Sequence, residues 1–163
     1  MKNVEYIIVG DGYAGLFLAH QLIKNNKSFV IFSEGRKSAS QVSAGIINPV
    51  VLKKFTTFWK AQEQIDFLKD SLNEIKSYTG ENYLINAPIH RIFHDENEQN
   101  LWLKKSANEE LSHFLDQNFN RLNGVKNDFL TGKVNKSARL DVNGFFTGLF
   151  NYFEKNDHLV KEK

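Results

Sequence analysis

The chain has 163 residues, of which 41% are hydrophobic, and its formal net charge is +2. This length suits one domain, or one domain with an inserted subdomain, and 14 phenylalanines supply enough apolar surface for a core, which argues against global disorder. Cysteine is absent, so disulfides, thiolate metal sites and thiol nucleophiles are excluded, and the scattered basic residues indicate neither nucleic acid nor an anionic membrane as a partner.

The N-terminus enters an apolar strand after Asn3 and lacks the basic, apolar and small-residue zones of a signal peptide. No apolar run approaches the roughly 20 residues that a membrane helix needs. We therefore expect a soluble, cytoplasmic protein.

The first 34 residues carry the pattern of a strand, a glycine turn, a helix and a second strand. The apolar run Val4–Val9 leads directly into the turn 10–15, whose sequence fits G-x-G-x-x-G. Apolar residues then recur at helical spacing, and a second apolar run, Phe29–Phe32, arrives at Ser33 and Glu34. Alone, such a motif is often only a glycine-rich loop, but this context predicts dinucleotide binding.

Each glycine of the turn has a physical task in such a unit. Gly10 permits the tight turn, Gly12 lets the backbone approach a pyrophosphate, and Gly15 lets the helix pack close to the strand. The N-terminus of the helix then offers free N–H groups and the positive end of its dipole to phosphates.

A loop and a long helix are expected next. Residues 35–49 are small and polar and predict an ordered loop. From Thr57 to Tyr78, apolar residues between Phe58 and Ile75 recur at spacings of three and four, which predicts a helix that Gly80 is placed to end. We expect its apolar stripe to pack in the core rather than to bind a partner.

The remaining elements are shorter. A polar helical region is expected over 96–118. Asp141 is placed to N-cap a helix that carries a phenylalanine cluster over 145–153, and another strand begins at Leu159. Four further strand-like pieces are expected, at 83–85, 89–93, 133–134 and 138–140.

This order departs from a simple nicotinamide-dehydrogenase domain, which would continue with further βα units after the second strand. The pattern favours an FAD-type domain interrupted by substrate-domain segments. We expect residues 1–50 and about 130–163 to form an incomplete FAD-binding domain. Residues 51–130 would form a substrate-domain segment of helix and antiparallel strands.

Four segments carry a resemblance to a known family: 7–16, Ile-Ile-Val-Gly-Asp-Gly-Tyr-Ala-Gly-Leu; 29–34, Phe-Val-Ile-Phe-Ser-Glu; the small-residue loop 38–49; and 138–141, Ala-Arg-Leu-Asp. They resemble the FAD-dependent oxidoreductases related to D-amino-acid oxidase and glycine oxidase, in which the fourth reads Gly-Arg-Val-Asp. The resemblance spans most of the chain, although only the first three segments are specific. It implies an α/β fold, with a Rossmann-like FAD-binding βαβ unit and part of an α+β substrate domain.

The resemblance also implies a set of cofactor contacts. The turn would contact the FAD pyrophosphate through Gly10, Asp11, Gly12, Tyr13, Ala14 and Gly15. The end of the second strand would contact the adenosine ribose through Ser33 or Glu34. The ribityl chain and flavin ring would lie beside Ser43, Ala44, Gly45 and Ile46, where small residues let backbone N–H groups reach flavin oxygens.

Two residues depart from the family pattern. The ribose acid usually follows the apolar run directly, but Ser33 holds that position and Glu34 comes one residue later, either as the ribose contact or as a solvated surface residue. Asp11 would repel a pyrophosphate, so we expect its side chain to turn outward or to weaken binding. Family members are also considerably longer, and we expect this chain to be an N-terminal piece.

No catalytic residue is assigned, because flavin amine oxidation needs little acid–base help from the protein. His90 and His94 lie four apart in an expected strand, so no metal site is expected. Arg91 and Arg139 are expected in surface ion pairs, and Trp59 and Trp102 in the core rather than stacked on nucleic acid.

Three hypotheses follow. The first is an FAD-dependent oxidoreductase that oxidises an amine or amino-acid-like substrate. The second is an NAD(P)-linked dehydrogenase domain, since the opening βαβ unit does not choose between cofactors. The third is a catalytically incomplete nucleotide-binding fragment that associates with itself through surface left uncovered by truncation, with the helix stripe 58–75 and the cluster 145–153 as the surfaces expected to be exposed.

Overall fold

The computed structural model describes residues 3–161, which form two compact units. The first contains the residues up to Gly45, Asp70–Tyr83 and the residues from Leu140 on. The second contains Ile46–Lys69 and Leu84–Arg139. Asp70–Tyr83, which we expected in the substrate-domain segment, belongs to the first unit. What each unit binds remains a prediction.

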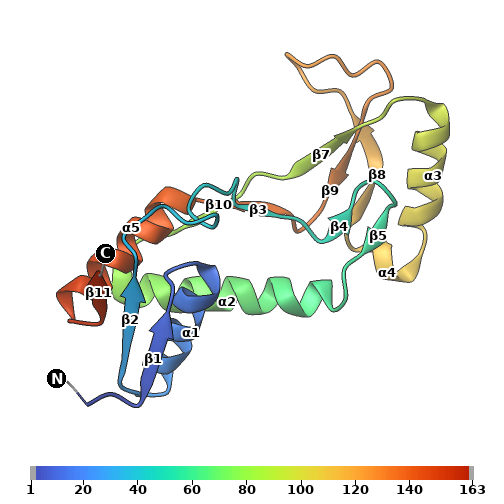
Figure 1. The fold of residues 1–163 in the computed structure, drawn as a ribbon. Helices are drawn as coiled ribbons and strands as arrows, with labels where there is room; N and C mark the ends of the chain where they lie inside the picture. The colour runs from blue at the N-terminus through green and yellow to red at the C-terminus, as the bar shows by residue number, and fades with distance from the viewer. Residues whose placement is uncertain (1–2, 162–163) are drawn as a thin grey trace. The chain divides into compact units, whose positions relative to one another are not determined.

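The first unit is built on a parallel sheet of three strands in the order β1–β2–β11 (Figure 1). β1 is Tyr6–Val9, β2 is Phe29–Ser33 and β11 is Leu159–Lys161. Helix α1, Tyr13–Lys24, connects β1 to β2, and α5, Val142–Lys155, precedes β11. The predicted parallel βαβ unit is confirmed, because β1 pairs in parallel with β2. The last strand joins the other edge of β2.

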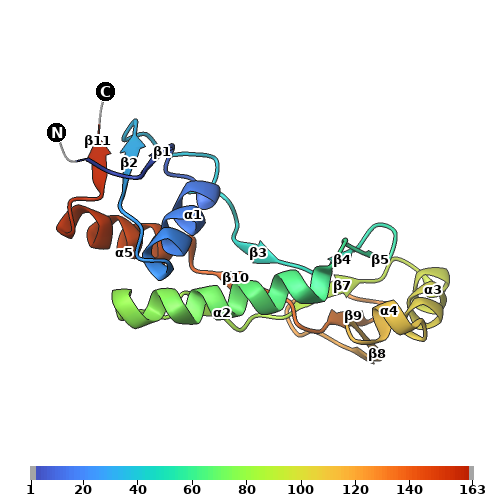
Figure 2. The same ribbon diagram turned by 90° about the horizontal axis from the view of Figure 1, so that it is seen from below.

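Both helices lie on the same side of this sheet (Figure 2), and aromatic side chains pack them there. Phe29 of β2 meets Phe153 of α5 edge-on, with ring centroids 6.0 Å apart. Phe17 of α1 stacks on Phe145 of α5 at 5.6 Å. Asp141 caps α5 as expected, since its Oδ1 accepts a hydrogen bond from the N–H of Gly144 at 3.1 Å.

The surfaces that the fragment hypothesis expects to be exposed are mostly buried, and the expected core packing of the long helix's apolar stripe is confirmed. In the cluster 145–153, Phe145 and Phe153 are fully buried because they pack on the sheet and on α1. In the stripe 58–75, Phe58 is half exposed, but Ile65 and Leu72 are buried. Large apolar side chains that the first unit does expose include Ile7 (65% exposed) and Val9 (86% exposed) on the face of β1 opposite the helices, and also Tyr6, Leu18 and Val42.

A polar cluster with a buried histidine lies between α1 and the C-terminal half of α2, Ala61–Thr79, which ends at Gly80 as predicted. The imidazole of His20 is 2% exposed; its Nε2 lies 3.0 Å from Oε2 of Glu74, and its Nδ1 lies 3.3 Å from the hydroxyl of Tyr78. Lys24 donates to the other oxygen of Glu74 at 2.6 Å. Burial lowers the pKa of His20, although the Glu74 carboxylate opposes this effect.

This histidine should make stability depend on pH. Because its pKa is lower in the folded chain than in the unfolded chain, the unfolded chain binds more protons as the pH drops below about 6.5, and stability is lost. We expect the urea midpoint of unfolding to fall between pH 7.5 and pH 5.5. Replacing the buried imidazole, His20→Gln, should flatten this dependence, whereas His113→Gln, at an exposed histidine, should leave it unchanged. Equal slopes in both variants would contradict the assignment.

The second unit is built on an antiparallel sheet in the order β7–β9–β8 (Figure 1). β7 is Ile89–Ile92, β9 is Thr131–Val134 and β8 is Leu115–Asn120, with α3, Glu96–Ser106, and α4, Glu109–Ser112, between β7 and β8. Short strands form two further ladders: β3 (Ile46–Ile47), β10 (Ala138–Leu140) and β6 (Leu84–Ile85) in one, β4 (Val50–Val51) and β5 (Thr56–Thr57) in the other.

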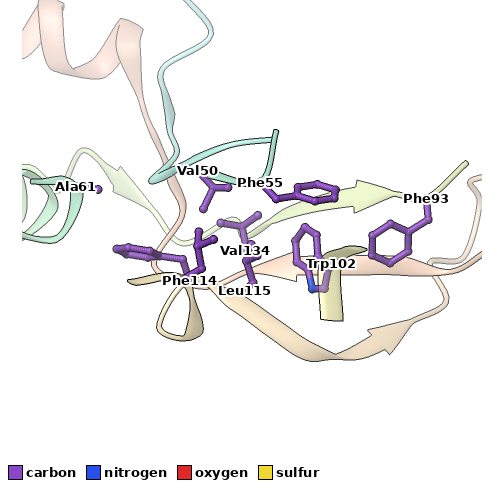
Figure 3. Packing of buried hydrophobic residues seen from close by; sticks show 9 residues of the cluster. Val50, Phe55, Ala61, Phe93, Trp102, Phe114, Leu115 and Val134 are labelled. Carbon is purple, nitrogen blue, oxygen red and sulfur yellow. The ribbon is translucent and has the colours of Figure 1, made fainter. Parts of the chain in front are cut away.

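Trp102 is fully buried in the core of the second unit, where Phe55 and Phe93 pack edge-on against it (Figure 3). The ring centroids of these pairs are 5.2 Å and 5.5 Å apart. The indole N–H donates to the carbonyl of Asp116 at 2.7 Å, which satisfies its one donor. Trp102 is therefore a core residue, as expected.

The structure corrects three sequence-based expectations. The long helix begins at Ala61 rather than Thr57, because Thr56–Thr57 pair as β5 with β4. The polar helix expected over 96–118 ends at Ser106, and β8 begins at Leu115, because pairing with β9 overrides the helical pattern. Trp59 is 78% exposed rather than buried, with the ammonium of Lys60 5.4 Å from its ring centroid.

Gly132 of β9 leaves the space that the buried indole fills. A Cβ at this position would stand 2.6 Å from Trp102 and 2.7 Å from Phe93. We expect Gly132→Ala to lower the free energy of unfolding by about 1–3 kcal/mol, because overpacking displaces rigid rings. Chemical denaturation measures this change, with Lys133→Ala on the same strand as the control. Equal stability of Gly132→Ala and the unmodified chain would contradict the packing described.

Candidate functional site

A cavity of about 570 Å³ opens at the carboxyl ends of β1 and β2. Residues 9–11 at the end of β1, 32–34 at the end of β2 and 36–38 of the following loop line it. In open parallel sheets, ligands bind in the crevice at the carboxyl ends of the strands. This cavity is therefore the candidate site, and it contains four of the sequence-predicted residues, Gly10, Asp11, Ser33 and Glu34.

The glycine turn brings β1 and α1 into close contact beside this cavity. Gly10 has φ +99°, a conformation that favours glycine, and its N–H donates to the carbonyl of Phe32 at 2.9 Å. A Cβ on Gly15 would stand 2.3 Å from the carbonyl oxygen of Gly10. Only a hydrogen atom fits between the first turn of α1 and the end of β1.

The N-terminus of α1 has no side-chain cap of its own, because Gly12 occupies the N-cap position. A serine from the loop after β2 serves it instead: Ser40 Oγ accepts from the N–H of Tyr13 at 3.3 Å. Ser43 Oγ lies 2.9 Å from the Tyr13 hydroxyl. The structure thus brings the serine loop to the end of α1 that the sequence assigns to a pyrophosphate. Ala14 is exposed on that first turn.

The other predicted loop residues lie further along the chain. Ala44 is exposed, and Gly45, with φ +66°, accepts a hydrogen bond from the N–H of Leu140 at 2.7 Å. A Cβ on Gly45 would stand 2.5 Å from the Leu140 carbonyl oxygen, so this glycine permits a close backbone crossing. Ile46 is the first residue of the second unit. Contact of these residues with a flavin remains a prediction.

Asp11 does not turn outward, which excludes the first of the two alternatives that we expected for it. Its residue is 9% exposed, and its Oδ2 accepts a hydrogen bond of 2.6 Å from Ser33 Oγ. The physical reason is the serine itself, which offers a buried carboxylate a hydroxyl donor at the end of the neighbouring strand.

Two basic residues of the site were not predicted. Arg36 and Lys37 are exposed and line the cavity directly after the second strand. In the sequence they are two adjacent cations after Gly35, but Lys53–Lys54 and Lys104–Lys105 are similar pairs, so this signal did not single them out. Cations at this edge attract an anionic ligand such as a nucleotide.

The residues considered for other chemistry have structural partners. His90 Nδ1 lies 3.2 Å from the hydroxyl of Thr131, and His94 Nδ1 lies 2.9 Å from Glu98. Arg91 Nε donates to Glu98 at 2.8 Å, in the ion pair that we expected. Over residues 3–161, no group of three His, Cys, Asp or Glu side chains could hold a metal ion. In the same range, no helix has both the length and the apolar character to cross a bilayer.

Comparisons with known proteins bear on this fold. No family model matches the sequence. Among solved structures, glycine oxidase from Geobacillus kaustophilus matches with a TM-score of 0.64 and 16% identity, over 96% of this chain and 45% of that chain. L-amino acid deaminase from Proteus vulgaris matches with a TM-score of 0.68 and 16% identity, over 99% and 40%. Iminodiacetate oxidase from Chelativorans sp. BNC1 matches with a TM-score of 0.70 and 12% identity, over 96% and 46%.

This chain shares the fold of these enzymes. The match runs through both units, because it covers 96–99% of the chain. It also confirms the predicted fold class, in which helices combine with a parallel sheet. The chain spans less than half the length of each of the three structures.

Gly15 offers a test of the glycine turn. We expect Gly15→Ala to lower the free energy of unfolding by about 1–3 kcal/mol, because the added Cβ meets the rigid backbone of Gly10. Thermal or urea unfolding measures the loss. The control is Leu18→Ala, at an exposed position of the same helix that makes no such contact. It should change the free energy of unfolding little. If Gly15→Ala were as stable as the control, the close approach described would be incorrect.

Proposed function

We propose that the chain is part of an FAD-dependent oxidoreductase that oxidises an amine or amino-acid-like substrate. The observation that carries this proposal is the shared fold: three structures that cover almost the whole chain are a glycine oxidase, an L-amino acid deaminase and an iminodiacetate oxidase. Each name describes chemistry at an amine or amino acid. The sequence resemblance to the FAD-dependent oxidoreductases supports the same proposal independently.

The described residues fit a dinucleotide of this kind. The N-cap residue Gly12 has no side chain to cap α1, and Ser40 Oγ takes the N–H of Tyr13. A pyrophosphate would take the other N–H groups of the first turn. The backbone of the turn from Gly10 to Gly15 would hold the pyrophosphate, the ends of β1 and β2 the adenosine, and residues 43–46 the flavin end. When bound, FAD supplies the hydride acceptor, while the protein binds and orients the substrate. We assign no catalytic residue, and we propose the cytoplasm as the location.

Two alternatives remain open. An NAD(P)-linked dehydrogenase domain would share the opening βαβ unit, which is a Rossmann-like arrangement in either case. A nucleotide-binding unit that lacks turnover by itself is favoured by the extent of the match, which covers 40–46% of the compared chains. In that case the exposed residues Ile7 and Val9 are the surface that we propose for self-association, since exposed apolar patches mark interaction sites.

Cofactor titration separates these alternatives. We expect the purified 163-residue chain to bind FAD with a dissociation constant in the micromolar range or below, with a visible flavin absorption band after gel filtration, and to bind NAD and NADP more weakly. Amine-dependent bleaching of the band under anaerobic conditions would support the oxidoreductase. FAD binding without bleaching would support the second alternative, a nucleotide-binding unit that is catalytically inactive by itself. Binding of NAD but not FAD would overturn the proposal.

Charge variants show whether the cavity at the ends of β1 and β2 is where FAD binds. We expect the double variant Arg36→Ala, Lys37→Ala to weaken FAD binding by up to about tenfold, because each exposed cation contributes a fraction of a kcal/mol to anion binding. The double variant Lys104→Ala, Lys105→Ala changes the net charge equally on α3 of the second unit. It should leave the affinity unchanged. If both double variants lose FAD affinity to a similar degree, the cause is the change in net charge and not a contact in the cavity.

A further inference from the structure

The candidate nucleotide site lacks an acid where a βαβ unit normally carries one. Dinucleotide-binding units place an Asp or Glu about 20 residues after the glycine turn, at the end of the second strand, where its carboxylate binds the ribose hydroxyls. Here β2 ends at Ser33. A serine offers one hydroxyl and no negative charge, so it cannot replace a carboxylate that accepts two hydrogen bonds.

A carboxylate nevertheless lies beside this position, and it comes from the other strand. β1 and β2 pair in register up to Val9 and Phe32, so the residues that follow each strand are neighbours. Asp11 follows Gly10 in the turn after β1, and its Oδ2 lies 2.6 Å from Ser33 Oγ. Both residues line the cavity and both are more than nine-tenths buried.

Ser33 fixes the orientation of this carboxylate. Its Oγ accepts a hydrogen bond from the N–H of Gly35 at 3.0 Å, which leaves its own proton for Asp11. The hydroxyl therefore acts as a donor to Oδ2, and the loop backbone keeps it in place. The pair occupies one oxygen of the carboxylate and leaves Oδ1 for another donor.

A further donor to Oδ1 would stabilise this carboxylate. Over residues 3–161, Asp11 takes part in no ion pair, and Ser33 provides the one hydrogen bond to its side chain. A largely buried carboxylate without a cation requires hydrogen-bond donors. A phosphate group cannot supply them and is repelled, whereas a ribose carries two adjacent hydroxyl donors.

Glu34 is less suited to this role. Glu34 follows the last residue of β2, Ser33, and also lines the cavity. Its side chain is exposed, while Ser33 is buried. An exposed glutamate would bind a ribose against full competition from water.

We propose that Asp11, held by Ser33, is the acid that binds the hydroxyls of the adenosine ribose. The ribose acid has thus moved from the end of β2 to the turn after β1. This inference rests on the proposed function, since it names the residue that recognises the adenosine part of FAD. It also implies that the site rejects a ribose that carries a 2′-phosphate, despite the cations Arg36 and Lys37 nearby.

The test compares ligands that differ only at the 2′ position. We expect the unmodified chain to bind ADP about tenfold or more tightly than 2′-deoxy-ADP by calorimetry, as for a hydrogen bond to a charged group. We expect it to bind ADP-ribose more tightly than 2′-phospho-ADP-ribose. Both comparisons use the unmodified chain, so they hold even if a variant fails to fold. A preference for the 2′-phosphate would overturn the proposal.

Two matched variants then locate the acid. Asp11→Asn and Glu34→Gln each replace a carboxylate in the cavity lining by the amide of the same size. We expect Asp11→Asn to bring the ratio of the ADP and 2′-deoxy-ADP affinities close to one, while Glu34→Gln keeps the unmodified ratio. Circular dichroism confirms that each variant is folded. The reverse pattern, or an unchanged ratio in Asp11→Asn, overturns the proposal.

Measuring FAD binding separates a failure of the role proposed for Asp11 from a failure of the proposed function. If the chain binds FAD and ADP but does not discriminate the 2′-hydroxyl, the role of Asp11 is wrong and the proposed function stands. If neither FAD nor ADP binds, the proposed function fails and the role of Asp11 fails with it.

Discussion

The close approach of α1 to the end of β1 is the constraint on which the first unit depends. A hydrogen atom on Gly15 is all that separates the helix from the carbonyl oxygen of Gly10. This contact sets where the helix begins and therefore where the N–H groups of its first turn lie, next to the cavity. It also places Phe17 against Phe145 of α5, so the packing of the second helix follows from the position of the first.

Hydrogen bonds from neighbouring loops complete the same region. Gly10 bonds to the carbonyl of Phe32, Ser33 holds Asp11, and Ser40 meets the first N–H of α1. Each bond joins the turn after β1 to the end of β2 or to the loop behind it. The ligand-facing surface is therefore supported by two strands and a helix, rather than by one flexible loop, and this favours precise recognition.

The sequence predicted the first unit well and the second less well, for a physical reason. Local signals decide the glycine turn, the Asp141 cap and the helix end at Gly80, and all three were correct. The pairing of β8 with β9 is not local, so the polar pattern after Ser106 suggested helix where Leu115 begins a strand. The Asp11 orientation was also missed, because it depends on a hydroxyl 22 residues away. Strand alternation alone does not reveal it.

The pairing of β11 with β2 also bears on how the chain folds. Leu159 pairs with Ile31, and the segments of the second unit lie between them in the sequence. The parallel sheet therefore closes only after the ribosome has made nearly all of these residues, whereas the antiparallel sheet needs contacts within residues 89–134. Contacts close in sequence cost less loop entropy and form faster. During synthesis, the parallel sheet beside the cavity would thus form later than the antiparallel sheet.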